Sequence, residues 1–387
     1  MPSDRLRRFA RLESETPYAA LDIDAVEHAH DRYRTALAGR GRVQFAVKAR
    51  PEPQVLTALL RGGASLDVAS TAEIHLALAA GCPPERISHS NVVRDEREIA
   101  EAFALGVRMF CADSAAELTR LGRHAPGASV LLRLVCAPRG AALSMTARFG
   151  CGADEAVELA RLAEGMGLDM AGLTWHVGSQ QTDPSQWRIA VERAAGVWTA
   201  IRAAGVSSLR VLDVGGGIPA TYRRAVPSVA DCVATIFAAI DDHFDATDLD
   251  VVFEPGRSLV AEAGITVARV KSVVERDGLV RVVLDAGIWN AGLIECLLGD
   301  VEYPVEALDH AADAPDRPVV LHGPSCDPLD ELRVTTPYRL PVALAPGDRV
   351  LIGSTGAYCA TMVTPDFCGY PAPPLHVLPA RAMEVSR

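Results

Sequence analysis

From Val43 to Gly256 two kinds of segment alternate, and this alternation constrains the fold more than any other feature. Eight short runs are rich in apolar and β-branched residues, which is typical of buried strands. They are VQFAVKA (43–49), SLDVAS (65–70), RISHSN (86–91), VRMFCAD (107–113), SVLLRLV (129–135), AGLTWHV (171–177), RVLDVGGG (210–217) and DVVFEPG (250–256). Segments of helical period follow them, and those after Ser70 and Asp113 open on a Ser/Thr cap signal and end near Gly.

This count decides the fold class. Eight strand–helix units in roughly 220 residues match a (β/α)8 barrel, the TIM barrel of the α/β class. A doubly wound sheet is the rival arrangement, but it usually has fewer strands. We therefore predict an α/β protein built on a TIM barrel.

A different pattern follows Ala261. The run ITVARVKSVVERDGLVRVVLDAG (265–287) alternates like paired strands around an Asp-Gly turn, and short β runs with prolines continue toward the C-terminus. This indicates a mostly antiparallel β domain, to which TPYAALDID (16–24) is expected to add a strand. The predicted boundaries are 23–263 for the barrel, and 1–22 with 264–387 for a domain of β-sandwich or β-barrel type.

Composition narrows the function. A net charge of −11 argues against a nucleic-acid-binding protein, which would present a basic face. Nine cysteines without a C-x-x-C pair indicate neither a zinc site nor a disulfide framework, so no metal is expected and the thiols fit a reducing cytosol. We find no signal peptide and no apolar run of the ~20 residues that span a membrane. These features predict a cytoplasmic protein with no membrane or nucleic-acid partner.

Polar residues gather where the predicted strands end, which in a barrel is where the chemistry lies. They are Lys48, Asp67, Asn91, Asp113, Arg133, His176, Gly215 to Gly217, and Glu254 with Arg257. A lysine after an apolar strand is usually solvated, and only occasionally an amine kept for chemistry. The whole set at successive strand ends predicts one converging site.

Three motifs each have a functional and a structural interpretation. The glycines of DVGGGIP (213–219) would let backbone N–H groups approach an anion, or they form only a tight loop. In FEPGRSL (253–259), Glu254 and Arg257 would act on a ligand or on each other as an ion pair. In TWHVGSQ (174–180), His176 would stack on a heterocycle or fill a core position.

Two loops nearer the C-terminus add candidates. HGPSCDPLDEL (322–332) places Cys326 and Asp327 in a Gly/Pro-rich loop, where the thiol is either a small filler or a proton donor. GSTGAYCATM (353–362) presents Tyr358 after a glycine turn.

Pyridoxal 5'-phosphate (PLP) needs all of these groups: a lysine, a phosphate cup, a carboxylate for the pyridine nitrogen and a group packed on the ring. The order FAVKA, LDVAS, HVGS, DVGGGIP, EPGR, GPSCDPLD and GAY resembles the fold-type III PLP-dependent decarboxylases, the ornithine/lysine/diaminopimelate decarboxylase family. The resemblance covers nearly the full length, and the combined order is specific although no single motif is. It implies an alanine-racemase-like barrel with a C-terminal antiparallel β domain.

The resemblance implies a role for each matching residue. Lys48 would carry the cofactor as a Schiff base, His176 would stack on its ring, and Glu254 would keep its pyridine nitrogen protonated. Arg133 and Glu73 would support that network, with Asp67 nearby. The phosphate would be held by Ser179, Gly215, Gly216, Gly217, Gly256, Arg257 and Tyr358.

The implied reaction is decarboxylation at the α-carbon, giving an amine and CO2 in amino-acid metabolism or polyamine biosynthesis. Cys326 would return a proton to that carbon. Racemases of the same fold set an arginine against the pyridine nitrogen, so Glu254 favours a decarboxylase. The family also implies a homodimer whose active sites are shared, with the Cys326 loop supplied by the second subunit.

The substrate is less constrained. The implied substrate-binding residues are Asp327, Trp289, Leu298 and Tyr358. SCDPLD resembles the ornithine decarboxylase branch, but Leu298 stands where that branch has an acidic residue for the distal amine, and Trp289 stands where a tyrosine is usual. Losing a charge-assisted bond costs about 1.5–3 kcal/mol. Asp327 alone, or Asp300 or Glu295, would have to hold an ammonium.

Three readings of the function stay open. The substrate is ornithine- or lysine-like, or it is a specialised biosynthetic amino acid. A diaminopimelate-type decarboxylase is an alternative. A non-catalytic, decarboxylase-like regulator that binds a protein partner is less favoured, because the chain keeps Lys48, Glu254, Arg257 and Cys326.

Overall fold

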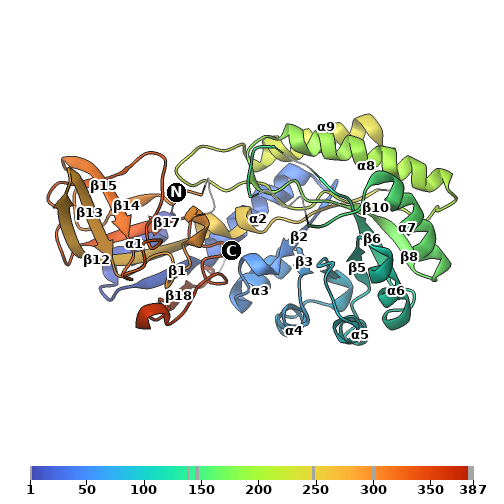
Figure 1. Ribbon diagram of the computed structural model, residues 1–387, viewed down its shortest axis with the longest axis horizontal. Helices are drawn as coiled ribbons and strands as arrows, with labels where there is room; N and C mark the ends of the chain where they lie inside the picture. The colour runs from blue at the N-terminus through green and yellow to red at the C-terminus, as the bar shows by residue number, and fades with distance from the viewer. Residues whose placement is uncertain (1, 137–138, 144–147, 246–248, 298–300, 382–387) are drawn as a thin grey trace, which may run out of the picture. The chain divides into compact units, whose positions relative to one another are not determined.

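The computed structural model describes residues 2–136, 139–143, 148–245, 249–297 and 301–381 (Figure 1). The chain forms two compact units. The barrel unit comprises residues 29–219 and 227–256, and the β unit comprises 1–28, 220–226 and 257–387. The domain boundaries expected from the sequence stay a prediction.

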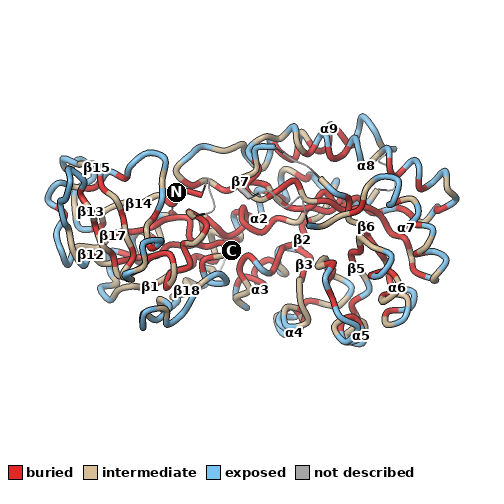
Figure 2. The backbone as a smooth tube through the Cα atoms, in the orientation of Figure 1, coloured by how far each residue is buried: buried red, intermediate tan, exposed pale blue. Residues whose placement is uncertain are grey.

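The barrel unit is a closed barrel of eight parallel strands, which confirms the predicted fold class. Each of the eight predicted runs contributes one strand. They are β2 (Arg42–Ala46), β3 (Ser65–Val68), β4 (Ile87–His89), β5 (Met109–Ala112), β6 (Ser129–Arg133), β8 (Asp169–Thr174), β10 (Val211–Asp213) and β11 (Asp250–Phe253), and β11 pairs with β2 to close the ring. In Figure 2 these strands are mostly red, as expected for strands covered on both faces.

Helices connect the strands, as a parallel barrel requires. They are α3 (Pro53–Arg61), α4 (Thr71–Ala79), α5 (Glu96–Ala104), α6 (Ala115–His124), α7 (Ala153–Gly165), α8 (Ser185–Ala203) and α9 (Val229–His243), and α2 (Ile23–Leu37) precedes β2. The predicted caps are confirmed: the Ser70 side chain accepts from the Glu73 N–H, and the Ser114 side chain accepts from the Glu117 N–H. A two-stranded ribbon, β7 (Ala141–Leu143) with β9 (Ser179–Gln181), was not expected from the sequence.

The β unit is built on one eight-stranded sheet. Its strands are β1 (Tyr18–Asp22), β12 (Gly264–Arg276), β13 (Leu279–Leu284), β14 (Val305–Ala307), β15 (Asp316–His322), β16 (Tyr338–Pro341), β17 (Arg349–Gly353) and β18 (Leu375–Leu378). Most pairs are antiparallel, but β1 with β18 and β13 with β15 are parallel, so the sheet is mixed.

Two sequence expectations for this sheet are confirmed. β12 and β13 form a hairpin whose turn residues Asp277 and Gly278 have φ of 55° and 72°, the left-handed pair that an Asp-Gly turn favours. β1 joins the sheet between β12 and β18.

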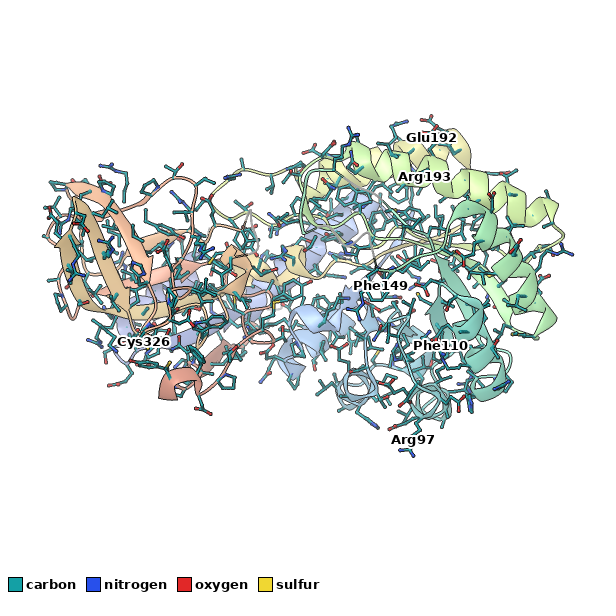
Figure 3. All side chains as sticks on the ribbon, viewed as in Figure 1. Arg97, Phe110, Phe149, Glu192, Arg193 and Cys326 are labelled. Atoms are coloured by element: carbon teal, nitrogen blue, oxygen red, sulfur yellow. The ribbon has the colours of Figure 1, made fainter. Side chains whose placement is uncertain are left out.

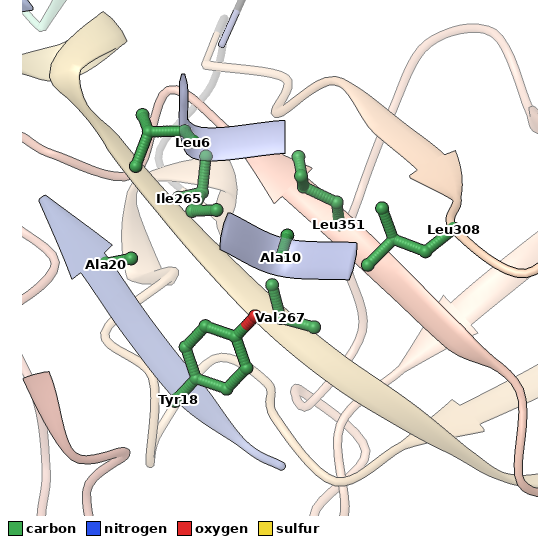
Figure 4. Close-up of a cluster of buried hydrophobic side chains, with 8 residues drawn as sticks. All are labelled: Leu6, Ala10, Tyr18, Ala20, Ile265, Val267, Leu308 and Leu351. Carbon is green, nitrogen blue, oxygen red and sulfur yellow. The ribbon is translucent and has the colours of Figure 1, made fainter. Parts of the chain in front are cut away.

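Helix α1 (Asp4–Leu12) was not predicted. Its apolar face packs on the sheet in a buried cluster, drawn in Figure 4, of Leu6, Ala10, Tyr18, Ala20, Ile265, Val267, Leu308 and Leu351. Ser3 caps its first turn by accepting from the Leu6 N–H.

Among the described residues, no helix combines the length and the apolar character needed to cross a membrane.

Candidate functional site

Lys48 lies just beyond the end of a barrel strand. β2 ends at Ala46, and a short 3-10 turn, Val47–Ala49, carries the lysine. The register pairs Ala46 with Asp67 on β3, so the lysine emerges beside that carboxylate. Its Nζ lies 3.4 Å from Asp67 Oδ2, and 51% of its side chain is exposed. The apolar strand thus ends on an amine that solvent and small molecules can reach.

Three carboxylates gather on the strands next to this amine. Asp67 and Asp213 are buried on β3 and β10, and half-buried Glu254 follows β11. Glu254 Oε1 accepts from two neutral donors, Gln44 Nε2 at 3.4 Å and Ser90 Oγ at 3.2 Å.

The electrostatics of this cluster are unfavourable for negative charge. Burial raises the pKa of Glu254 well above its ordinary value, Asp213 and Asp67 raise it further, and Lys48 opposes them. Burial likewise raises the pKa of Asp213 to about 6, although its Oδ1 accepts from the Gly215 N–H at 2.8 Å. These carboxylates would be stabilised by a further cation beside Glu254.

His176 follows β8 and stays neutral. Burial lowers its pKa to about 3, and the positive charges of Arg133 and Lys48 act in the same direction. Its Nδ1 accepts from the Gly178 N–H at 2.9 Å. Arg133, at the end of β6, lies with its guanidinium carbon 5.4 Å from the centre of the Phe149 ring, which is labelled in Figure 3. The structure therefore brings an uncharged imidazole close to the amine and its carboxylates.

The three glycines after β10 cannot carry side chains. A Cβ on Gly215 would collide with the Trp175 carbonyl, and one on Gly217 with the Gly178 carbonyl. A Cβ on Gly216 would lie 2.6 Å from the Glu254 carbonyl oxygen and 3.3 Å from His176 Nε2. The space in front of His176 and Glu254 is thus kept open by glycine. Because packing alone requires these glycines, the phosphate role stays a prediction.

The other barrel candidates lie nearby or serve local structure. Glu73 Oε2 accepts from the Ala69 N–H at 2.7 Å, and burial raises its pKa, with Asp67 raising it further. Ser179 begins β9 opposite Leu143. Asn91 donates to the Ala69 carbonyl and Asp113 accepts from the Gly150 N–H, so both support loops.

Arg257 anchors a buried cluster in the β unit. It directly follows Gly256 and begins the short helix α10 (Arg257–Val260). Its guanidinium donates to both oxygens of Glu295 at 2.7 and 2.5 Å and to the Tyr222 hydroxyl at 2.7 Å. The ring of Tyr358 lies 4.9 Å from its guanidinium carbon. The sequence raised an ion pair with Glu254; among the described residues, Glu295 is a carboxylate that pairs with this arginine.

This pairing bears on one of the alternatives for binding the substrate. Glu295 was one of two acidic residues considered as a replacement for the acid missing at Leu298. It is buried, and Arg257 occupies both of its oxygens, so it has a structural partner already. Leu298 and Asp300 lie outside the described residues.

The loop that carries Cys326 is held by a residue the sequence analysis did not single out. Asp330 is buried and accepts from the Ser325 N–H, the Ser325 hydroxyl and the Ile288 N–H at 3.0, 2.6 and 2.8 Å. Asp327 Oδ1 accepts from the Leu329 N–H at 2.7 Å. Cys326 itself is exposed and is labelled in Figure 3. The loop therefore presents a thiol from a firmly bonded turn.

Trp289 lies next to the segment that binds this loop. Its carbonyl accepts from the Thr364 N–H at 2.8 Å, and its ring centre lies 5.3 Å from that of Phe367. Among the described residues, its buried indole N–H has no hydrogen-bond partner. Trp289 is thus a packed aromatic with one unused donor among the described residues.

One strong indication in the sequence was missed. The chain contains only two lysines, Lys48 and Lys271. Lys271 lies on β12 with its Nζ 3.3 Å from the Tyr370 hydroxyl, on the exposed surface of the β unit. Any chemistry that needs a lysine amine in the barrel can use only Lys48.

These residues fit the cofactor that the sequence predicted. The Lys48 amine is accessible, Glu254 lacks a strong cationic partner, and buried Asp67 Oδ1 has no hydrogen-bond partner among the described residues. A protonated pyridine nitrogen would supply the positive charge that Glu254 lacks, and neutral His176 suits a face-to-face contact with a ring.

Comparison with known proteins agrees with this geometry. Residues 23–261 match the family model described as "Pyridoxal-dependent decarboxylase, pyridoxal binding domain". Diaminopimelate decarboxylase of Pseudomonas aeruginosa is 34% identical over 89% of this chain and 83% of its own. Antizyme inhibitor 2 of Xenopus laevis is 29% identical over 97% of this chain and 84% of its own.

A solved structure extends the similarity to the whole fold. Lysine/ornithine decarboxylase of Vibrio vulnificus, complexed with putrescine, superimposes with a TM-score of 0.86 at 28% identity, covering 98% of this chain and 99% of that one. The match therefore includes both the barrel unit and the β unit.

Proposed function

The chain belongs to the pyridoxal-dependent decarboxylases, and from that premise we propose that it removes the α-carboxylate of an ornithine- or lysine-like or specialised biosynthetic amino acid. It is a carboxy-lyase, and its products are an amine and CO2. Its cofactor is pyridoxal 5'-phosphate.

One observation carries the proposal for the site. Lys48, the only lysine of the barrel unit, lies 3.4 Å from Asp67 in a group of carboxylates whose charge is poorly compensated. Such a group is costly to keep in a folded protein unless a cationic ligand completes it. A protonated PLP ring is a ligand of that kind.

Each barrel residue has a distinct task in this proposal. PLP, when bound, supplies an electron sink for the pair left on the α-carbon as CO2 departs. Lys48 would hold the cofactor through its amine. Glu254 would hold a proton at the ring nitrogen, which would keep that sink strong. His176 offers an uncharged face for the ring, and Arg133, Glu73 and Asp67 keep these groups in place.

The remaining predicted residues bind the phosphate and finish the reaction. Ser179, Gly215, Gly216, Gly217, Gly256, Arg257 and Tyr358 are proposed to hold the phosphate. The thiol of Cys326 is proposed to deliver a proton to the α-carbon after CO2 has left.

Substrate choice is proposed to depend on the β unit. Asp327 keeps one carboxylate oxygen beyond the one that accepts from Leu329, so it can meet a distal amine, whereas Glu295 is bound to Arg257. With leucine at position 298, we propose a substrate whose distal group is longer, modified or less cationic than that of ornithine. Trp289, Leu298 and Tyr358 are the proposed neighbours of that group.

A regulator that binds a protein partner is the second candidate, because antizyme inhibitor 2 covers nearly all of this chain. Against it, the chain keeps Lys48, Glu254 and Cys326. Bound cofactor and released CO2 separate the two, since a regulator needs neither.

We also propose a cytoplasmic homodimer with shared active sites. The exposed position of Cys326 supports a role toward a second subunit, and nine free cysteines suit a reducing compartment. Mixing inactive Lys48→Ala and Cys326→Ala variants should restore activity through hybrid dimers. If mixtures that exchange subunits stay inactive, the sites are not shared.

The decisive experiment is a difference spectrum of the PLP-loaded protein with ornithine, lysine, arginine, glutamate and diaminopimelate, with CO2 release followed in parallel. We expect a visible cofactor band and CO2 from at least one basic amino acid or a longer analogue. Efficient, preferred turnover of ornithine would overturn the proposed effect of Leu298. The absence of a cofactor band would overturn the enzymatic proposal.

A further inference from the structure

An aromatic residue outside all the motifs of the sequence packs on the interior of the barrel. Phe149, labelled in Figure 3, is half-buried and lies between β7 and α7. It contacts a buried cluster that consists of Val92, Cys111, Leu131, Ala171, Val211 and Val252. The last five of these residues lie on β5, β6, β8, β10 and β11, so the cluster fills part of the barrel interior.

The ring of Phe149 also lies next to two positive charges. The guanidinium carbon of Arg133 is 5.4 Å from the ring centre, and that of Arg148 is 5.0 Å from it. Both distances are within the roughly 6 Å over which an aromatic ring attracts a cation. Among the described residues, neither arginine side chain forms an ion pair or a hydrogen bond. The ring is therefore the contact that the structure gives to each guanidinium.

The backbone beside Phe149 is held in place by the barrel. The Gly150 N–H donates to Asp113 Oδ2 at 2.9 Å, and the Cys151 N–H donates to the Arg133 carbonyl at 2.9 Å. Gly150 has a φ of 101°, which a residue with a side chain rarely adopts. Arg133 thus binds this segment through its carbonyl and contacts its ring through its guanidinium.

Arg133 lies close to the proposed site. The register of β6 and β8 pairs it with Thr174, two residues before His176, and its charge helps to lower the pKa of that histidine. Gly216 lies between His176 and Glu254, because a Cβ on this glycine would be 3.3 Å from His176 Nε2 and 2.6 Å from the Glu254 carbonyl oxygen. An arginine and an uncompensated carboxylate therefore lie on opposite sides of one histidine.

This arrangement leaves two opposite charges unpaired. A guanidinium binds a carboxylate through strong, charge-assisted hydrogen bonds, so Arg133 and a carboxylate of the cluster would be expected to pair. Instead, Arg133 contacts the Phe149 ring, and Glu254 accepts only from the neutral side chains of Gln44 and Ser90 among the described residues.

We propose that Phe149 is a positioning residue that acts through Arg133. The face of its ring stabilises the guanidinium at the end of β6, so the cation stays beside His176 and outside the carboxylate cluster. Glu254 then keeps the uncompensated charge that the protonated ring of the cofactor would meet. This inference rests on the proposed function for the identity of that cofactor, whereas the contact between the ring and the arginine does not.

Three variants of the full-length chain test the proposal. Phe149→Leu keeps an apolar side chain but removes the aromatic face, and Phe149→Tyr keeps that face. Phe103→Leu is the matched control, because Phe103 is a half-buried phenylalanine on α5 whose ring centre lies 4.0 Å from the guanidinium carbon of Arg108.

The first measurement is the dissociation constant of PLP, obtained by titrating the cofactor-free chain and following the visible band. Phe149→Leu should raise this constant by about 3- to 30-fold, the range expected for the loss of such a contact. Phe149→Tyr should restore it to within about twofold, and Phe103→Leu should leave it unchanged. Equal values for Phe149→Leu and the wild type, or an equal loss in Phe149→Leu and Phe149→Tyr, would overturn the role of the aromatic face.

The second measurement needs no cofactor. Glu254→Gln is introduced into the wild type, Phe149→Leu and Phe103→Leu, and the urea midpoint of unfolding is measured near pH 8. The substitution should raise the midpoint in the wild type and in Phe103→Leu. In Phe149→Leu the rise should shrink to about half or less, because the released guanidinium can already pair with Glu254. An equal shift in all three backgrounds would overturn the positioning role.

The two measurements separate this inference from the proposed function. A wild-type chain that shows no cofactor band contradicts the proposed function, and the unfolding midpoints still decide whether Phe149 positions Arg133. A normal band in the wild type with equal midpoint shifts in all backgrounds leaves the proposed function standing and overturns the inference.

Discussion

Two glutamates illustrate how differently this fold treats a carboxylate. Glu295 in the β unit has both oxygens bound by Arg257, with Tyr222 on the same guanidinium. Glu254 in the barrel unit has neutral donors and two neighbouring carboxylates, and its pKa is raised by burial and by those neighbours. Charge compensation distinguishes the carboxylate that stabilises the β unit from the one proposed to meet the cofactor.

The largest effect should follow removal of the amine beside the uncompensated cluster. Lys48→Ala should lower decarboxylation by about 10³-fold or more, since covalent attachment of the cofactor depends on this amine. The fold should survive, because half of this side chain is already exposed. CO2 release and the visible cofactor band measure the first effect, and thermal unfolding measures the second.

Lys271→Ala is the matched control, since it removes the other lysine of the chain from the surface of the β unit. It should leave both the band and the rate unchanged. An equal loss in both variants would show that Lys48 has no special role.

Replacing Glu295, whose charge Arg257 compensates, should destabilise the folded protein. Glu295→Gln keeps the volume but leaves Arg257 without its anionic partner, and breaking a buried pair on one side costs about 3–5 kcal/mol. Urea unfolding of the cofactor-free protein should show this loss. A cost below 1 kcal/mol would mean that the pair is not a structural element.

A third substitution tests the electrostatic cost of the carboxylate cluster in the barrel unit. Glu254→Gln should raise the unfolding free energy of the cofactor-free protein by about 1–3 kcal/mol near pH 8, because it removes a poorly compensated charge. Activity should fall about 10²-fold or more.

The pH dependence of the unfolding free energy tests the direction of the stability change in Glu254→Gln. Folding raises the pKa of Glu254, so its contribution to stability is full below its ordinary value of 4.5 and is lost as the pH rises through the higher folded value. Asp213, with a pKa of about 6, acts in the same direction. The advantage of Glu254→Gln should therefore shrink as the pH falls toward 4, and an advantage that grows on acidification would contradict the assignment.

The smallest effect is expected where a carboxylate is compensated but exposed. Arg42 and Asp250 form a pair at the start of β11, with side chains 37% and 44% exposed. Asp250→Asn should change the unfolding free energy by less than about 0.5 kcal/mol. A loss comparable to that of Glu295→Gln would show that burial is irrelevant to the strength of such pairs.

The barrel could be predicted from the sequence because its information is local. Each strand is a short apolar run, each cap is a serine beside its helix, and the hairpin of β12 and β13 turns on Asp277 and Gly278. The positions of Lys48, His176 and Glu254 follow from the strand ends, so their proximity to one another was also accessible.

In the β unit, the important contacts join residues that are far apart in the sequence. Glu295 meets Arg257 from 38 positions away, and Asp330 meets Ile288 from 42. No periodicity or residue spacing in the sequence predicts contacts of this kind. Helix α1 was missed although its indications are local, since Ser3 caps its first turn and Leu6 and Ala10 lie at helical spacing on one buried face.

The position of β1 has a consequence for the order in which the protein can fold as it is synthesised. β1 ends at Asp22, but its neighbours β12 and β18 begin at Gly264 and Leu375. At about 5–20 residues per second, the ribosome needs on the order of tens of seconds to deliver both partners. The barrel strands are all translated in that interval, so β1 must wait with open edges, and a chaperone that covers it would protect the nascent chain from aggregation.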